Sequence, residues 1–153
     1  MTVREATLED WSYLTRFVEE MNLERVELYH EPDYARLHLA TIKAALEHQL
    51  GGVYIAESEY GGEPIGFTAM LRFPEMPENM AEGIGTYVSP EHRRAKVAHE
   101  LGVACREFHR ARGVRVIRGS VYLENSPSIA RCLAEGAKIT GFLLEYPIEG
   151  HEG

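Results

Sequence analysis

The sequence has few cysteines, and they form no pattern that would hold a structural metal. Only two occur in 153 residues, Cys105 and Cys132. Neither belongs to a CxxC pair, and the seven histidines include no HExxH motif. A structural zinc site needs four such ligands at close spacing. We therefore expect two free thiols and no metal.

Long apolar runs are also missing. No stretch approaches the roughly 20 apolar residues that would cross a bilayer. The N-terminal stretch MTVREATLEDW contains charged and polar residues within its first ten positions, unlike a secretory signal. We expect one cytoplasmic domain over residues 1–153, without membrane association.

Net positive charge is lacking as well, since 24 acids outnumber 16 Lys and Arg, giving a net charge of −8. This balance argues against nucleic-acid binding, which depends on neutralising phosphates. Basic residues nevertheless gather between Arg93 and Arg118, where Glu100 and Glu107 are the acids. Such a segment favours a small anionic ligand over a long polyanion, although a solvated helix face explains the charge equally well.

Hydrophobic periodicity predicts an ordered series of helices and strands. Thr7 and Asp10 form a capping box before the first helix, and Gly51-Gly52 ends the second. The predicted helices cover 8–23, 33–50, 93–111 and 128–135. The predicted strands cover 2–7, 53–57, 65–71, 82–88, 114–122 and two short segments within 137–148.

Three stretches of the chain carry a resemblance to a known family. Residues 81–90 (AEGIGTYVSP) run into Glu91-His92-Arg93-Arg94, like a strand ending in V-x-P-x-x-R. Residues 93–98 (RRAKVA) stand where a family would have R/Q-x-x-G-x-G/A, and Asn125 precedes Gly136 by eleven residues. With the order of elements, these stretches resemble the GNAT (N-acetyltransferase) superfamily over almost the whole chain. The resemblance implies an α/β (α+β) fold with a mixed central sheet of about six to seven strands flanked by about four helices.

The resemblance implies acetyl-CoA as cofactor, with CoA as the product. The N–H groups and dipole at a helix N-terminus favour a diphosphate there. An ordinary basic helix start is the alternative. Lys96 stands where the family has its first glycine, so its side chain either crowds the cofactor or contacts a phosphate; Ala98 keeps the small residue. The residues implied to bind the cofactor are Tyr87, Val88, Arg93, Arg94, Ala95, Lys96, Val97, Ala98 and Asn125.

Two side chains are candidates for the chemistry. Glu82 lies six residues before Val88, where the histone-acetyltransferase branch has its catalytic base. A solvent-facing glutamate at a strand end is the alternative. Cys132 replaces a tyrosine thought to protonate the leaving thiolate; a thiol can donate a proton, but a buried cysteine more often only packs. Gly83 and Gly85 suit the bulge that the family carries in this strand, with the Val88 N–H as the oxyanion donor.

Acceptor binding is expected at the loop between the first two helices and at residues 74–79. Both are acidic, and Tyr29 and Tyr34 are the candidate substrate-binding residues. An acidic rim favours a cationic acceptor, either a small-molecule amine or a protein lysine or N-terminus. Two other functions stay open: a binding or regulatory module with lost or altered cofactor use, and a nucleic-acid-modifying enzyme on the same fold. Dimers through the terminal strands are common in the family, so a homodimer is a further expectation.

Overall fold

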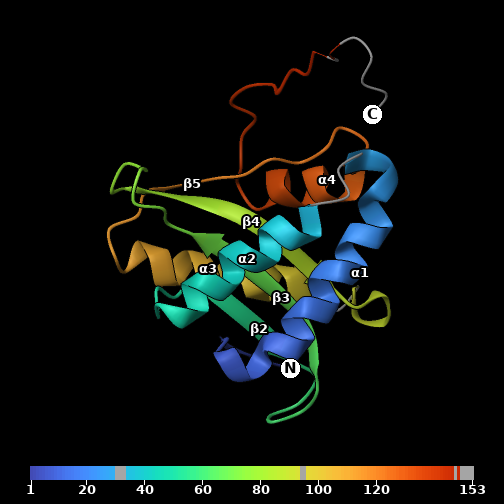
Figure 1. Ribbon diagram of the computed structural model, residues 1–153, viewed down its shortest axis with the longest axis vertical. Helices are drawn as coiled ribbons and strands as arrows, with labels where there is room; N and C mark the ends of the chain where they lie inside the picture. The colour runs from blue at the N-terminus through green and yellow to red at the C-terminus, as the bar shows by residue number, and fades with distance from the viewer. Residues whose placement is uncertain (30–33, 94–95, 147, 149–153) are drawn as a thin grey trace.

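The computed structural model describes residues 1–29, 34–93, 96–146 and 148. Its centre is a sheet whose five strands lie in chain order, β1-β2-β3-β4-β5 (Figure 1). The first four strands are antiparallel, and β5 runs parallel to β4. Their bounds are Thr2–Glu5 (β1), Val53–Glu57 (β2), Pro64–Leu71 (β3), Met80–Val88 (β4) and Val116–Arg118 (β5).

Four α-helices accompany the sheet, as predicted. They are α1 (Trp11–Tyr29), α2 (Tyr34–Glu47), α3 (Val97–Arg110) and α4 (Ser126–Ala134), with short 3-10 turns at Leu8–Asp10 (η1) and Pro90–His92 (η2). The predicted capping box is present, since Asp10 Oδ2 accepts from the Thr7 N–H at 2.8 Å. α1 continues six residues beyond its predicted end at 23. α3 begins four residues after its predicted start at 93, because η2 and Lys96 take non-α conformations.

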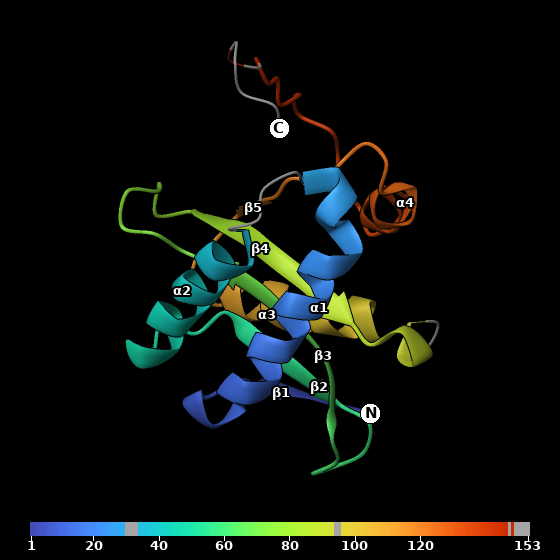
Figure 2. The ribbon, with the colours of Figure 1, turned by 45° about the vertical axis from the view of Figure 1, so that its right-hand side comes forward.

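The helices cover both faces of the sheet. In Figures 1 and 2, α1 and α2 cross one face while α3 lies behind the other. Leu14 and Phe17 of α1 and Ile42 of α2 are fully buried against Phe67 of β3. On the opposite face α3 contributes a smaller core made by Ala56, Ile65, Val88, Val97 and Leu101. This three-layer packing confirms the predicted fold class.

The connection from α2 into β2 is tightly packed against α3. Gly52 has φ +87°, and a Cβ there would lie 2.3 Å from the Met70 carbonyl oxygen, so only glycine fits. The thiol of Cys105, on α3, donates a hydrogen bond to the Gly52 carbonyl at 3.3 Å. Burial raises the pKa of the Cys105 thiol to about 12, which makes it unreactive. Both cysteines are free thiols.

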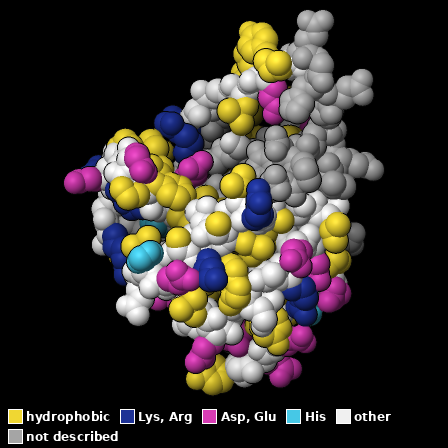
Figure 3. All heavy atoms as spheres, viewed as in Figure 1, with side chains coloured by type: hydrophobic (Ala, Val, Ile, Leu, Met, Phe, Trp, Pro, Cys, Tyr) yellow, Lys and Arg dark blue, Asp and Glu magenta, His cyan; other side chains and the backbone are white. Residues whose placement is uncertain are grey.

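The predicted strands within 137–148 are absent from the described residues of that segment. Beyond Gly136 the described chain lies outside the sheet, and its apolar side chains are open to solvent; Ile139 is 67% exposed and Leu143 is 83% exposed. Figure 3 shows hydrophobic side chains on the surface at the upper end of the molecule, where this segment lies in Figure 1. A strand needs a neighbour to satisfy its backbone groups, and this segment lies beside none.

None of the helices in the described part of the chain combines the length and apolar character that a bilayer span requires.

Candidate functional site

A wedge opens between β4 and β5. Their parallel pairing is limited to Met80↔Val116, Ala81↔Ile117 and Glu82↔Arg118. Over residues 83–88, β4 has β3 on one side and, among the described residues, no strand on the other. Figure 1 shows β5 meeting β4 near one end only. The open edge presents backbone N–H and C=O groups that pair with no described strand to any extended ligand that enters the wedge.

The open edge contains the predicted bulge. Ala69 pairs with Gly85 while Met70 pairs with Gly83, so Ile84 is the extra residue of β4. A bulge leaves its extra residue outside the ladder and increases the local twist. The irregularity therefore lies within the part of β4 that β5 leaves uncovered.

Glu82 lies where the wedge begins. It is the last residue of β4 to pair with β5, and its side chain is exposed. The carboxylate forms no hydrogen bond or ion pair with another described residue. Such a carboxylate can accept a proton from a group placed in the wedge.

At the end of β4, the backbone groups of Val88 and the side chain of Tyr87 face different parts of the molecule. The Ser89 N–H donates to the Ile65 carbonyl of β3 at 2.8 Å. Since strand backbone groups alternate sides, the Val88 N–H and C=O face away from β3, toward the open edge. The Tyr87 side chain instead packs in the α1 core and donates to Glu20 Oε2 at 2.9 Å. Burial, and then this hydrogen bond, raises the pKa of Tyr87 to about 12, so the phenol stays protonated.

The N-terminus of α3 follows a backbone conformation that favours glycine. Lys96 is the N-cap, with φ 60° and ψ 20°, in the left-handed region. Its side chain makes no capping hydrogen bond. The first N–H groups of a helix have no acceptor within the helix, and here these belong to Val97, Ala98 and His99. Lys96 thus adopts a conformation that glycine takes more readily, and Arg94 and Ala95 lie outside the described residues.

The guanidinium of Arg93, predicted to bind the cofactor, is engaged by protein groups. Its Nη2 lies 2.7 Å from both carboxylate oxygens of Glu24 on α1, and its Nε donates to the Val88 carbonyl at 2.8 Å. The sequence analysis missed Glu20 and Glu24. Their spacing of four residues places them on one face of α1, which was the only signal of a shared role.

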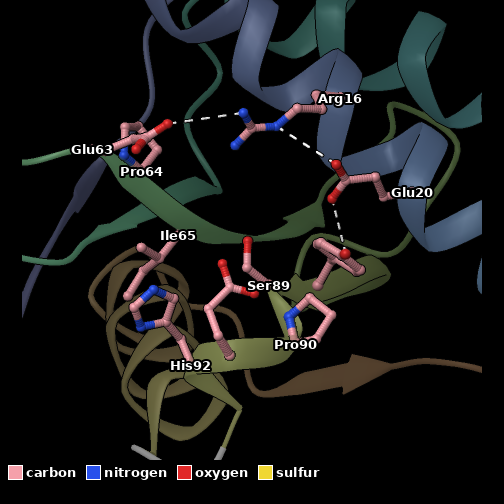
Figure 4. A pocket seen from close by; sticks show the side chains of 10 residues that line it. Arg16, Glu20, Glu63, Pro64, Ile65, Ser89, Pro90 and His92 are labelled. Atoms are coloured by element: carbon pink, nitrogen blue, oxygen red, sulfur yellow. Dashed lines mark hydrogen bonds and ion pairs between the residues drawn. The ribbon is translucent and has the colours of Figure 1, made fainter.

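A hollow of about 440 Å³ lies between α1 and the end of β4 (Figure 4). A chain of polar contacts crosses it: Arg16 lies 3.9 Å from Glu63 and 3.8 Å from Glu20, and Glu20 holds the Tyr87 hydroxyl. The turn that leads to α3, from Ser89 to His92, forms the opposite wall. The hollow adjoins the end of β4, so a ligand there would be close to the start of the turn between β4 and α3, which we call the cofactor turn.

The predicted residues of α4 form a separate group. Asn125 caps α4, its side chain accepting from the Ser128 N–H at 3.4 Å. Its contact with the cofactor stays a prediction. Cys132 is half-buried within α4. No residue of α4 itself is buried. The carboxylate of Glu135, at the C-cap of α4, lies 3.0 Å from His99 and 3.5 Å from Arg106 of α3, and 3.3 Å from Arg131 of α4 itself.

The two candidate acceptor residues lie at helix ends. Tyr29 is the last residue of α1 and Tyr34 the first of α2. Residues 30–33 and the side chains of both tyrosines lie outside the described part of the structure. Their role in acceptor binding stays a prediction. Within the described ranges, no group of three or more His, Cys, Asp or Glu side chains is arranged to hold a metal ion.

Known structures share this architecture. A mutant of the BH1408 protein from Bacillus halodurans superposes with a TM-score of 0.78 at 17% identity, covering 97% of this chain and 100% of that one. A predicted acetyltransferase with acetyl-CoA from Clostridium acetobutylicum gives 0.72 at 18% identity, covering 99% of each chain. The aminoglycoside acetyltransferase AAC(6')-Iy, in complex with a bisubstrate analogue, gives 0.69 at 20% identity, covering 97% of each chain.

A search of curated proteins finds no match. The model of the acetyltransferase (GNAT) family matches residues 11–132, which include α1, the whole of β4, the turn to α3 and most of α4. These residues contain both the wedge and the helix N-terminus beside it. The chain belongs to the GNAT acetyltransferase family.

Proposed function

We propose that this protein is an N-acetyltransferase that moves an acetyl group directly from acetyl-CoA to an amine. The observation that carries the proposal is the open edge of β4, which leads from Glu82 to the uncapped N-terminus of α3. One end of this path suits an amine and its base, and the other suits a diphosphate.

The residues present fit acetyl-CoA. The amides of the pantetheine arm can pair with the open edge of β4 as an added strand would. The N–H groups of Val97 and Ala98, together with the Lys96 ammonium, favour the diphosphate. The structural likeness to proteins solved with acetyl-CoA or a CoA conjugate agrees with this assignment.

Acetyl-CoA supplies a thioester carbonyl carbon that a free amine can attack. The acceptor reaches the site as an ammonium ion, and Glu82 takes its proton, directly or through one water. The Val88 N–H, which faces the open edge, donates to the thioester oxygen as negative charge develops there. As the C–S bond broke, the nitrogen would release its second proton to water, and the departing thiolate would take a proton from solvent or from Cys132.

The acceptor is a small-molecule amine or a protein lysine or N-terminus. Glu82 is acidic and exposed, and the hollow beside β4 is bordered by Glu20, Glu63 and Glu91. Glu20 and Glu63 are balanced by Arg16, so Glu82 and Glu91 are the acids that attract a cationic acceptor to the site. AAC(6')-Iy is an aminoglycoside acetyltransferase, and a ribosomal-protein-alanine N-acetyltransferase from Brucella melitensis has the same fold, so the fold accommodates both acceptor classes.

Calorimetry with CoA and acetyl-CoA, followed by assays of thiol release on a panel of amines, tests the proposal. We expect binding in the micromolar range and release of one CoA for each amine acetylated. A protein that gives no binding heat at millimolar CoA would not be an acetyl-CoA enzyme. It would then be the binding or regulatory module, which the left-handed Lys96 and the engaged Arg93 favour.

The same proposal extends to assembly and location: the protein acts in the cytoplasm as a homodimer. The chain has an open outer edge on β5 in its described part, and the described residues beyond Gly136 form an apolar segment that joins no strand of its own sheet. In a symmetric dimer, the segment beyond Gly136 of each copy can pair with the β5 edge of the other copy. The exposed apolar residues of this region include Val121, Leu123, Ile139, Phe142, Leu143, Leu144 and Tyr146.

Sedimentation equilibrium tests the assembly. We expect the full chain to be dimeric and a double variant, Phe142→Asp with Leu144→Asp, to be monomeric. A full chain that stays monomeric at high micromolar concentration would contradict the homodimer.

A further inference from the structure

The guanidinium of Arg93 is held by three protein groups. Nη2 lies 2.7 Å from both oxygens of Glu24, Nε donates to the Val88 carbonyl at 2.8 Å, and the guanidinium carbon lies 5.3 Å from the centre of the Tyr87 ring. The side chain therefore joins the turn after β4 to α1. Both members of the ion pair are about two-fifths exposed, at 43% and 40%.

The face of α1 that packs toward this turn carries two hydrogen-bond acceptors, Glu20 and Glu24, spaced four residues apart. Glu20 receives the Tyr87 hydroxyl, and Glu24 receives Arg93. Tyr87 is the penultimate residue of β4, and Arg93 follows η2, so the two donors bracket the start of the connection to α3. The end of β4 and the turn that follows are thus both attached to α1.

We propose that Arg93 is a positioning residue that holds the cofactor turn against α1, and not a phosphate ligand. This inference rests on the proposed function. By bonding to the Val88 carbonyl and to Glu24 together, Arg93 fixes where the turn leaves β4. It thereby sets how the open edge of β4 and the N-terminus of α3 lie relative to each other, and both surfaces must contact one cofactor molecule.

The two roles for Arg93 predict opposite effects at Glu24. If Arg93 bound a phosphate, it would first leave Glu24, and the carboxylate would compete with the ligand for the same cation. Removing the charge of Glu24 would then tighten CoA binding. If Arg93 positions the turn, removing that charge loosens the turn and weakens CoA binding.

The test is a double-mutant cycle of Glu24→Gln and Arg93→Lys, with CoA dissociation constants measured by calorimetry. We expect Glu24→Gln to weaken binding about threefold to fivefold, as for the loss of a well-formed, partly exposed ion pair. Arg93→Lys should weaken CoA binding by a similar factor, because an ammonium cannot bond to the Glu24 carboxylate and the Val88 carbonyl with the geometry of the planar guanidinium. The double variant should be no weaker than either single one. In steady-state assays the KM for acetyl-CoA should rise while the KM for the amine stays constant.

Glu19→Gln is the matched control, because it removes the same charge from α1 at an exposed neighbouring position. It should leave CoA affinity unchanged, and thermal unfolding should confirm that all variants fold. Tighter binding by Glu24→Gln, or unchanged binding by both single variants, would overturn the positioning role alone. A wild-type protein that binds no CoA would overturn the proposed function, and this role with it.

Discussion

The Nε2 atom of His109, on α3, lies 2.5 Å from the carbonyl oxygen of Met70, on β3. The imidazole is buried, and its Nδ1 meets no hydrogen-bonding partner among the described residues. Since a carbonyl can only accept, Nε2 carries the proton of the neutral ring. Burial lowers the pKa of His109, as do the charges of Arg112 and Arg72, although the Met70 carbonyl opposes them.

This histidine should make the stability of the fold depend on pH. Below the ordinary histidine pKa of about 6.5, the unfolded chain binds a proton that the folded chain resists. The free energy of unfolding should therefore fall as the pH decreases from about 6.5 toward the lowered folded-state pKa. Urea unfolding at several pH values should show a steeper fall for wild type than for His109→Gln. Parallel curves would contradict the prediction.

Replacing Lys96 with glycine should stabilise the protein. The left-handed conformation costs an L-residue about 1–2 kcal/mol, and glycine loses about 0.5–1 kcal/mol through its greater freedom when unfolded. We expect Lys96→Gly to raise the free energy of unfolding by about 0.5–1 kcal/mol. Lys96→Ala is the control, because it removes the same charge but keeps the Cβ; equal stability of the two variants would disprove the backbone explanation.

Glu82→Gln should slow acetyl transfer about a hundredfold or more at neutral pH, the usual contribution of a general base. Affinity for CoA and stability should hardly change, because the side chain is exposed and bonds to no other described residue. The loss should shrink as the pH approaches the pKa of the acceptor amine, which then needs no base. Glu59→Gln, at an exposed turn between β2 and β3, should behave as wild type. A variant with the wild-type rate would exclude Glu82 as the base.

Cys132→Ala should retain the transfer rate within about twofold, since half-buried cysteines usually serve packing. Solvent can protonate the leaving thiolate, so the thiol is dispensable in this interpretation. A hundredfold fall in rate, the size of a lost proton donor, restored in part by Cys132→Ser, would instead make the thiol the general acid.

The sequence predicted the bulge and the turn into α3, where short-range patterns determine the structure. The glycines at 83 and 85 indicated the bulge, and the motif before Arg93 placed the turn into α3. Glu82 could be located because its offset from Val88 along one strand fixes its place. The left-handed backbone at position 96 was not predicted, because lysine gives no signal of that conformation.

The role of Arg93 could not be predicted, because it depends on a partner 69 residues earlier in the chain. Acids spaced by four residues on a helix usually face solvent, so Glu20 and Glu24 did not stand out. The segment 137–148 was wrongly predicted as strands for a related reason. Apolar composition favours a strand, but strand formation depends on a neighbouring edge, which local sequence does not reveal.

The attachment of α4 makes the molecule sensitive to ionic strength. This helix buries no residue of its own, and its ion pair to α3 joins Glu135, whose side chain is 11% exposed, to Arg106, whose side chain is 40% exposed. The Debye length, over which charges attract each other in solution, falls from about 10 Å at 0.1 M salt to about 3 Å at 1 M. The apolar core around α1 and α3 lacks this weakness, because salt does not weaken hydrophobic burial. Concentrated salt should therefore free α4, and Asn125 at its start, while the rest of the molecule remains folded.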